Sequence, residues 1–410
     1  MKILQQAGNI EQMTDGSIVS PIGFEAGGVH AGLRYSKKDI GMIFTKLPAS
    51  CAAVYTQSEV RAAPLEVTQN SINAEGKLHG IIVNSACANA CTGKQGLLDA
   101  YETREVMAGK FNLPSRYFAV ASTGVIGEYL EMDKIKKGIS MIETSCNARA
   151  AKDFEEAILT TDTVTKSCSY RAVIDGKTIT MGGAAKGSGM IHPNMATMLG
   201  FITTDANVES AELKAALCQA ADASFNQITV DGDTSTNDMV LILANGAAGN
   251  RPLTSLHPEW DVFLGLLKAV AENLAKQIAR DGEGATKLIE VNVSGMKTKQ
   301  DAQQMAKVIV GSSLVKTAAY GADANWGRII AAMGRSGLKF NPDAADILFG
   351  DILVFKEGEP HPFSEGAAKK YLEEDSITIN VHLKEGNETG TAWGCDLTYD
   401  YVKINASYRT

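Results

Sequence analysis

The chain has little of what marks membrane-spanning, secreted or disulfide-stabilised proteins. Its 410 residues include 7 cysteines and 10 prolines, and only 6% of them are aromatic. No uninterrupted apolar run approaches the roughly 20 residues of a membrane span. The first residues, Met1-Lys-Ile-Leu-Gln-Gln-Ala-Gly-Asn9, lack the apolar stretch of a signal peptide. We therefore expect a cytoplasmic protein with no membrane partner.

Positive charge is also scarce. Lysine and arginine number 39 against 47 aspartate and glutamate residues, so the net charge is -8, and the basic residues form no run. A protein whose main partner is nucleic acid or an anionic membrane surface carries clustered basic residues. We expect neither partner here, and an anionic substrate would have to be bound by local cations.

Metal and nucleotide motifs are missing as well. The odd number of scattered cysteines indicates reduced thiols. Cys87 and Cys91 form the one close pair, but their three-residue separation is not that of a zinc knuckle, and the six histidines show no ligand spacing. Gly187-Ser-Gly189 is not completed to a dinucleotide-binding motif. We predict no metal and no cofactor, and expect both cysteines to lie buried at a helix start.

What the chain does have is an alternation of strand and helix patterns without repeats, which predicts a mixed α/β fold. Arg171 to Met181 is a hairpin pattern, with Asp175-Gly176 as its tight turn. The predicted helices are 213–225 and 260–278, and the predicted strands include 81–85, 117–122, 239–243, 288–293 and 377–383.

The most informative segment is Lys186-Gly-Ser-Gly-Met-Ile-His-Pro-Asn-Met-Ala-Thr-Met-Leu199, which places Thr197 between a glycine-rich turn and an apolar run. A hydroxyl needs a base to act as a nucleophile, and one solution is the threonine's own α-amine, freed by cutting the Ala196-Thr197 bond. That amine would have a pKa of about 7.7 to 8. The same residues also read as an ordinary buried strand, and taken alone they leave both interpretations open.

Further motifs run in order through nearly the whole chain. They are Asn84-Ser-Ala-Cys-Ala-Asn-Ala-Cys-Thr-Gly93, Ala121-Ser-Thr-Gly-Val-Ile-Gly127, Thr160-Thr-Asp-Thr163, Asp231-Gly-Asp-Thr-Ser-Thr-Asn-Asp238, Asp281-Gly-Glu-Gly-Ala-Thr-Lys287, Gly321-Ala-Asp-Ala-Asn-Trp-Gly-Arg328 and Asn405-Ala-Ser-Tyr-Arg-Thr410. Together with the segment around Thr197, they resemble the ornithine acetyltransferase family of arginine biosynthesis, the ArgJ family. Some members of that family are bifunctional glutamate N-acetyltransferases.

The resemblance implies a fold and a maturation step. It implies a layered α/β fold that resembles N-terminal-nucleophile hydrolases but differs from them in connectivity. The precursor would cut itself at Ala196-Thr197, giving an alpha chain of residues 1–196 and a beta chain of residues 197–410. Two copies of each chain would form a heterotetramer.

The resemblance also implies a site for covalent acetyl transfer. Thr197 would be the nucleophile, with Thr123 and Gly124 as the oxyanion-hole pair. Read locally, Thr123-Gly124 is only a turn that ends a strand. Preorganised donors at a developing oxyanion typically contribute the largest catalytic effect, about 3 kcal/mol per donor.

The family's substrates are N-acetylornithine and glutamate, and both carry an α-carboxylate. A lysine beside two glycines suits a carboxylate, whereas a glutamate suits an ammonium group. A solvated lysine and an exposed acid are the plain alternatives. The implied substrate-binding residues are Thr160, Lys186, Thr197, Glu283, Asn405 and Thr410. Thr161 and Thr163 lie close enough to replace Thr160, and a site that uses the last residue requires a docked final strand.

We therefore predict a self-processing acetyltransferase with ping-pong kinetics. Acetyl-CoA is a further acetyl donor in bifunctional members, and no motif here decides that activity. Two alternatives remain open. One is an N-terminal-nucleophile amidohydrolase or aminopeptidase that uses the same threonine, with water in place of glutamate. The other is a non-catalytic amino-acid-binding protein in which Thr197 is a buried strand residue.

Overall fold

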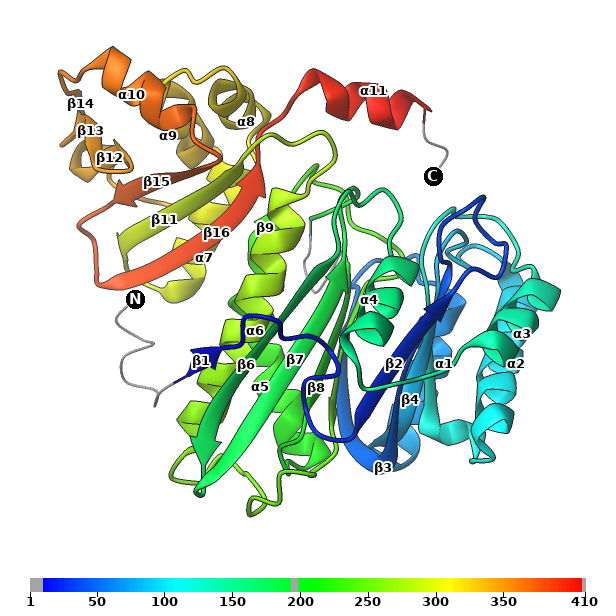
Figure 1. The fold of residues 1–410 in the computed structure, drawn as a ribbon. Helices are drawn as coiled ribbons and strands as arrows, with labels where there is room; N and C mark the ends of the chain where they lie inside the picture. Colours follow the sequence, from blue (N-terminus) through cyan, green and yellow to red (C-terminus); the bar gives the residue numbers. More distant parts are fainter. Residues whose placement is uncertain (1–9, 193–197, 408–410) are drawn as a thin grey trace.

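Two β-sheets with helices packed on them make up the computed structural model, which describes residues 10–192 and 198–407 (Figure 1). The main sheet has the strand order β1 (Glu11–Gln12), β6 (Lys166–Ile174), β7 (Lys177–Lys186), β8 (Leu199–Thr204), β10 (Met239–Ala244), β3 (Ile40–Tyr55), β4 (Lys77–Asn84) and β5 (Phe118–Ser122), with β2 (Phe24–Val29) also paired to β3. The second sheet has the order β14 (Glu359–Pro360), β13 (Ile352–Lys356), β12 (Asp346–Phe349), β15 (Ser376–His382), β11 (Leu288–Met296), β16 (Glu388–Cys395) and β9 (Ile228–Thr229).

Helices cover these sheets. They are α1 (Ala63–Glu75), α2 (Gly93–Phe111), α3 (Met132–Met141), α4 (Ala148–Ala157), α5 (Ser210–Asp222), α6 (Trp260–Arg280), α7 (Lys299–Val310), α8 (Ser313–Tyr320), α9 (Trp326–Gly334), α10 (Glu365–Leu372) and α11 (Tyr399–Ser407), with short 3-10 turns η1 (Ser115–Tyr117), η2 (Phe225–Gln227) and η3 (Pro342–Ala344). In the described part of the chain, none of these helices is both long and apolar enough to cross a bilayer.

The centre of the main sheet is buried on both faces. In β10, Val240 and Ile242 belong to the apolar cluster that contains α5 and α6, whereas Leu241 and Leu243 belong to the cluster on the opposite face. Successive strand residues point to opposite faces. Covering both faces therefore requires the continuous apolar run that the sequence shows at β10.

Helix α6 joins the two sheets. Its buried stripe includes Val270, Leu274 and Ile278, and the same apolar cluster contains Trp393 and Cys395 of β16 in the second sheet. Figure 1 shows α6 lying between the sheets. The main sheet, α6 and the second sheet therefore stack as layers, which confirms the predicted layered α/β fold.

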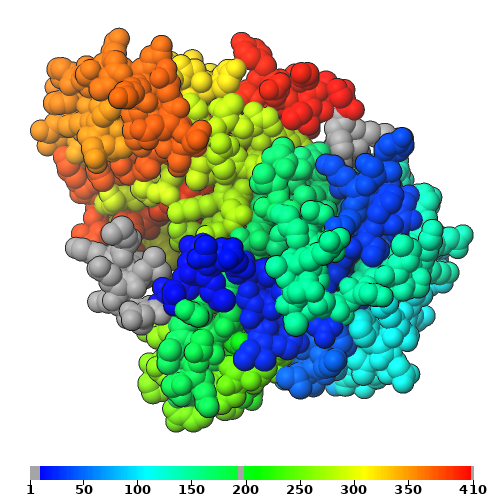
Figure 2. All heavy atoms as spheres, viewed as in Figure 1, coloured from blue at the N-terminus to red at the C-terminus, as the bar shows by residue number. Residues whose placement is uncertain are grey.

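The main sheet interleaves the residues that precede position 197 with those that follow it. Strands β8 and β10 lie between β7 and β3, with Lys186 opposite Leu199 and Met239 opposite both Leu199 and Tyr55. In Figure 2, blue residues from early in the chain lie against green ones from its middle, while the orange residues form a separate lobe. The predicted chains 1–196 and 197–410 thus share one sheet.

Most sequence predictions of local structure are confirmed, including the hairpin β6–β7, helices α5 and α6, and strands β10, β11 and β15. Two are wrong. Cys87 and Cys91 precede α2 rather than starting it, and Cys91 is exposed with a positive φ of 59°. The C-terminal segment is helix α11 rather than a strand. It leaves the second sheet after β16 and lies over the end of the main sheet (Figure 1).

Candidate active site

A cavity of about 410 Å³ opens at one edge of the main sheet. Six of the predicted site residues line it, namely Thr123, Gly124, Thr160, Lys186, Glu283 and Asn405. Met198, which directly follows Thr197 in the sequence, lines it too. Ala196, Thr197 and Thr410 lie outside the described residues, so their placement stays a prediction.

Strand direction and one long-range hydrogen bond together explain this convergence. Strand β7 ends at Lys186, and the loop after β5 that carries Thr123 is held to the segment before β10, because Asn237 Nδ2 donates to Ser122 O. The antiparallel strand β8 starts opposite Lys186, and β10 runs parallel to β8, so the segment before Met239 arrives at the same edge. Residues that are far apart in sequence therefore meet at this one edge of the sheet.

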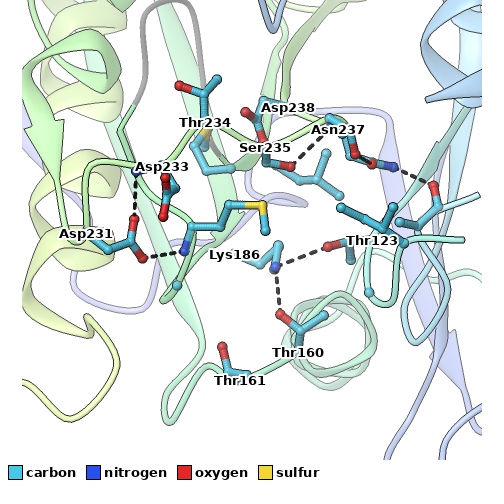
Figure 3. Close-up of a pocket in the computed structure, with 18 of the residues that line it drawn as sticks. Thr123, Thr160, Thr161, Lys186, Asp231, Asp233, Thr234, Ser235, Asn237 and Asp238 are labelled. Carbon is cyan, nitrogen blue, oxygen red and sulfur yellow. Dashed lines mark hydrogen bonds between the residues drawn. The ribbon is translucent and has the colours of Figure 1, made fainter. Parts of the chain in front are cut away.

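Lys186 lies at the centre of the cavity wall. Its ammonium group donates to Thr160 Oγ1 at 2.7 Å and to Thr123 Oγ1 at 3.2 Å (Figure 3). An ammonium has three protons to donate, so one remains for a ligand. Lys186 is 8% exposed, and this burial lowers its pKa from the ordinary value, partly offset by the charge of Asp162. The solvated-surface alternative for this lysine is therefore wrong.

Thr123 and Gly124 present donors to the same cavity. Thr123 Oγ1 accepts from Lys186, and among the described residues nothing accepts its hydroxyl proton. Within the same residues, the Gly124 N–H also has no acceptor. The loop is fixed, because Thr123 N donates to Asn84 O at 3.0 Å and Val125 N donates to Ala86 O at 2.9 Å. Two donors on a rigid loop suit a developing oxyanion.

Gly124 cannot be replaced without moving this loop. Its φ is +131°, and a Cβ would overlap the Ala86 carbonyl group and lie 2.6 Å from Cys87 N. We expect Gly124→Ala to lower kcat by about 10²- to 10³-fold, because one oxyanion donor is displaced. Steady-state kinetics of the folded variant test this.

The matched control is Gly127→Ala. Gly127 also has a positive φ, +83°, but a Cβ there meets nothing within 4 Å. Its substitution is expected to cost some stability through backbone strain while leaving kcat near the wild-type value. Equal kcat losses in the two glycine variants would contradict the assignment of Gly124 as a donor.

Glu283 and Asn405 form the opposite wall. Asn405 Nδ2 donates to Glu283 Oε2 at 2.7 Å, and Glu283 N donates to Ser188 O at 3.0 Å. A Cβ on Gly189 would overlap the Glu283 carboxylate, so a larger residue there would displace that carboxylate from its present position. Glu283 is 7% exposed, which contradicts the alternative of an exposed surface acid. The wall offers an anionic oxygen to a cationic ligand.

The motif segment Asp231–Asp238, whose polar residues predict a structural turn or one that borders the site, lines the cavity (Figure 3). Tyr401 lines it too, and no motif predicted that residue. Asp231 accepts from Met190 N at 2.6 Å and Ile191 N at 2.9 Å, and burial raises its pKa. Asn237 donates to Ala88 O at 2.6 Å and Ser122 O at 2.8 Å, so it braces the loop that carries Thr123. The polar composition of the segment was the available signal.

The described residues contain no group of three or more His, Cys, Asp or Glu side chains arranged to hold a metal ion. The charged and polar groups in the cavity are one ammonium, several carboxylates, hydroxyls and amides. Their arrangement suits a small ligand that carries both a carboxylate and an ammonium group.

Residues 25–410 match the sequence model of the ArgJ family. The chain belongs to the ArgJ family. It is 61% identical over 410 residues to the arginine biosynthesis bifunctional protein ArgJ of Geobacillus kaustophilus, covering 100% of both chains. The resemblance seen in the sequence is confirmed. ArgJ membership also favours an enzyme over a non-catalytic binding protein.

The solved structures that are similar to this ArgJ-family chain include the following two. One is ornithine acetyltransferase from Mycobacterium tuberculosis complexed with ornithine, at 34% identity and a TM-score of 0.43, covering 46% of this chain and 100% of that one. The other is L-aminopeptidase D-Ala-esterase/amidase from Ochrobactrum anthropi, described as a new variant of the Ntn hydrolase fold. It has 11% identity and a TM-score of 0.39, and the match covers 66% of this chain and 88% of that one.

Proposed function

We propose that this ArgJ-family enzyme transfers the acetyl group of N-acetylornithine to glutamate through an acetyl-Thr197 intermediate. The products are ornithine and N-acetylglutamate. One observation carries the proposal: a single cavity beside Met198 contains the Lys186 ammonium, the Thr123–Gly124 donors and the Glu283 carboxylate. These are the groups that a carboxylate, an oxyanion and an ammonium group require.

Maturation would use the same nucleophile. The Thr197 hydroxyl attacks the Ala196 carbonyl carbon, and the peptide nitrogen leaves as the Thr197 α-amine, giving an ester. Water then hydrolyses this ester and separates chains 1–196 and 197–410. Alanine is a small residue, and at position 196 its side chain would hinder this attack less than a larger one. The product is a threonine whose amine acts as its own base.

In turnover the free Thr197 amine accepts the hydroxyl proton as Oγ1 attacks the acetyl carbon. The Gly124 N–H and the Thr123 hydroxyl stabilise the oxyanion, and the Lys186 ammonium polarises that hydroxyl through the 3.2 Å hydrogen bond. The Thr197 ammonium then returns the proton to the departing ornithine nitrogen. The α-amine of glutamate, in its neutral form, attacks the acetyl-Thr197 ester by the reverse sequence.

The cavity has a partner for both charged groups of N-acetylornithine and for the α-carboxylate of glutamate. The α-carboxylate that both substrates carry is assigned to Lys186, and Thr160 fixes the ammonium of that lysine through the 2.7 Å hydrogen bond. The δ-ammonium of N-acetylornithine is assigned to Glu283, which Asn405 holds in place. Thr410 completes the site at the C-terminus as a prediction, as does assembly into a heterotetramer of two alpha and two beta chains.

The half-reaction tests this function directly. N-acetylornithine alone should release ornithine in stoichiometric amount and raise the mass of the beta chain by one acetyl group. Initial rates with both substrates should give the parallel double-reciprocal lines of ping-pong kinetics. A requirement for both substrates before any ornithine appears would contradict the covalent intermediate.

Product analysis separates transfer from hydrolysis. If acetate rather than N-acetylglutamate accumulates in the presence of glutamate, the amidohydrolase alternative is correct. Acetyl-CoA offered in place of N-acetylornithine tests the second activity. Labelling of the same beta chain by acetyl-CoA would make the enzyme bifunctional.

A further inference from the structure

A buried cluster of charged side chains lies beside the cavity wall and takes no part in the chemistry proposed above. Lys166 Nζ donates to Asp162 Oδ1 at 2.7 Å and to Asp281 Oδ2 at 2.6 Å. The Lys166 and Asp162 side chains are fully buried, and Asp281 is 7% exposed. Such charges are expensive to bury unless they are paired. Lys166 neutralises only one of the two negative charges. The Lys186 ammonium supplies the second positive charge that balances them.

Asp162 is the member that reaches the cavity residues. Its Oδ1 accepts from Gly187 N at 2.7 Å and its Oδ2 from Thr160 N at 3.0 Å. The Thr160 hydroxyl oxygen also accepts the hydrogen bond from the Lys186 ammonium. One carboxylate therefore fixes the backbone on both sides of the Lys186–Thr160 hydrogen bond.

Asp281 extends the cluster to the opposite wall. Its carboxylate accepts from Thr163 N at 3.1 Å and from the Thr163 hydroxyl. Its carbonyl oxygen accepts from Ser188 Oγ at 2.7 Å, and the carbonyl of Ser188 in turn accepts from Glu283 N. The loop before β6, the end of β7 and the end of α6 are thus held together beneath both charged walls of the cavity.

Four charged groups act on the Lys186 ammonium. They are Asp162 from the loop after α4, Lys166 from β6, Asp238 from the segment before β10, and Glu283 from the loop after α6. Desolvation lowers the pKa of Lys186 and Lys166 lowers it further, whereas the three carboxylates raise it. Burial alone would raise the pKa of Asp162, but Lys186 and Lys166 hold it well below its usual range.

We propose that Asp162 is a positioning residue that aims the Lys186 ammonium into the cavity and supplies the negative charge that keeps it protonated. Lys166 is its counterion, and Asp281 ties this unit to the Glu283 wall. The inference rests on the proposed function, because it takes Lys186 to be the group that holds the α-carboxylate of the substrate.

The test is the dependence of kcat/KM for N-acetylornithine on pH. Lys186 holds a carboxylate only while protonated, so activity falls as the pH rises through its pKa. Asp162→Asn removes a negative charge and is expected to move this alkaline limb down by about one unit or more, with at least a tenfold rise in KM. Lys166→Met removes a positive charge and is expected to move the limb up.

Asp205→Asn is the matched control. Asp205 is fully buried and accepts from Thr180 N at 2.8 Å and Ile22 N at 3.0 Å, near the start of β7 rather than its Lys186 end. This variant should be less stable than wild type, but the alkaline limb of its kcat/KM profile should lie at the same pH as that of wild type. A merely structural role for Asp162 predicts the same behaviour in Asp162→Asn, and that result would overturn the proposal.

Each outcome is informative. If Asp162→Asn does not accumulate as folded protein, Lys166→Met tests the proposal in its place. An alkaline limb that stays at the wild-type pH or moves to lower pH in Lys166→Met contradicts the proposal. A wild-type protein that transfers no acetyl group would instead reject the proposed function. An active wild type with unmoved limbs in both variants would reject only the positioning role of Asp162.

Discussion

Thr197→Ala is expected to give an uncut chain of 43.5 kDa with no acetyl transfer. The substitution removes the hydroxyl that would attack Ala196, so the base of the proposed mechanism, the free α-amine, never forms. Loss of a catalytic nucleophile costs about 10⁶-fold in kcat in a comparable covalent enzyme. Intact mass under denaturing conditions and a turnover assay measure the two effects on one sample.

Thr197→Ser separates the role of the hydroxyl from that of the methyl group. Serine supplies the same hydroxyl and, after cleavage, the same amine, so cutting and turnover should persist at reduced rates. A wild-type sample that stays at full length, or a Thr197→Ala variant that is cut, would reject Thr197 as the self-made nucleophile. The remaining hypothesis would then be Thr197 as a strand residue.

Lys186→Met is expected to give the second largest loss, about 30- to 5,000-fold in kcat/KM for both substrates. Truncating one partner of a buried, hydrogen-bonded charge pair costs roughly 2 to 5 kcal/mol. Both substrates carry the α-carboxylate, so KM should rise for both. A smaller fall in kcat is also expected, because the Thr123 hydroxyl loses its 3.2 Å contact with the ammonium.

A substrate analogue provides the control for this prediction. The amide of N-acetylornithine lacks the α-carboxylate, so wild type should use it poorly, and Lys186→Met should use it about as well as wild type does. If the variant discriminates between acid and amide as strongly as wild type, Lys186 does not bind the carboxylate. Lys186→Arg keeps the charge but not the compact ammonium, and is expected to recover only part of the activity.

Local elements could be predicted from the sequence because their causes are local. The hairpin turn Asp175–Gly176 has positive φ angles of 51° and 68°, and the apolar stripe of α6 is read from residues three and four apart. The C-terminal helix was missed because it has no buried residue, and so no apolar periodicity to read.

The site could be predicted only in part, since its geometry depends on long-range pairing. Motif resemblance named Thr123, Lys186 and Glu283, but no periodicity indicates that β8 and β10 lie between β7 and β3. The role of Asp162 was invisible for the same reason. Its partner Lys166 is four residues away, but Asp281, which completes the cluster, is 115 residues beyond Lys166.

Because strands from both predicted chains pair in the main sheet, a cut protein would refold differently from its precursor. In an uncut chain, β7 and β8 find each other as neighbours joined by a short connection. A cut at Ala196-Thr197 would turn that search into an encounter between two separate polypeptides. Chain 1–196 would lack the central strands β8 and β10, and chain 197–410 would lack the strands on both sides of them. Refolding of the mature protein would then depend on concentration, and mixing separately purified halves should restore little activity. The native arrangement would be reached once, from the precursor, and not readily regained after denaturation.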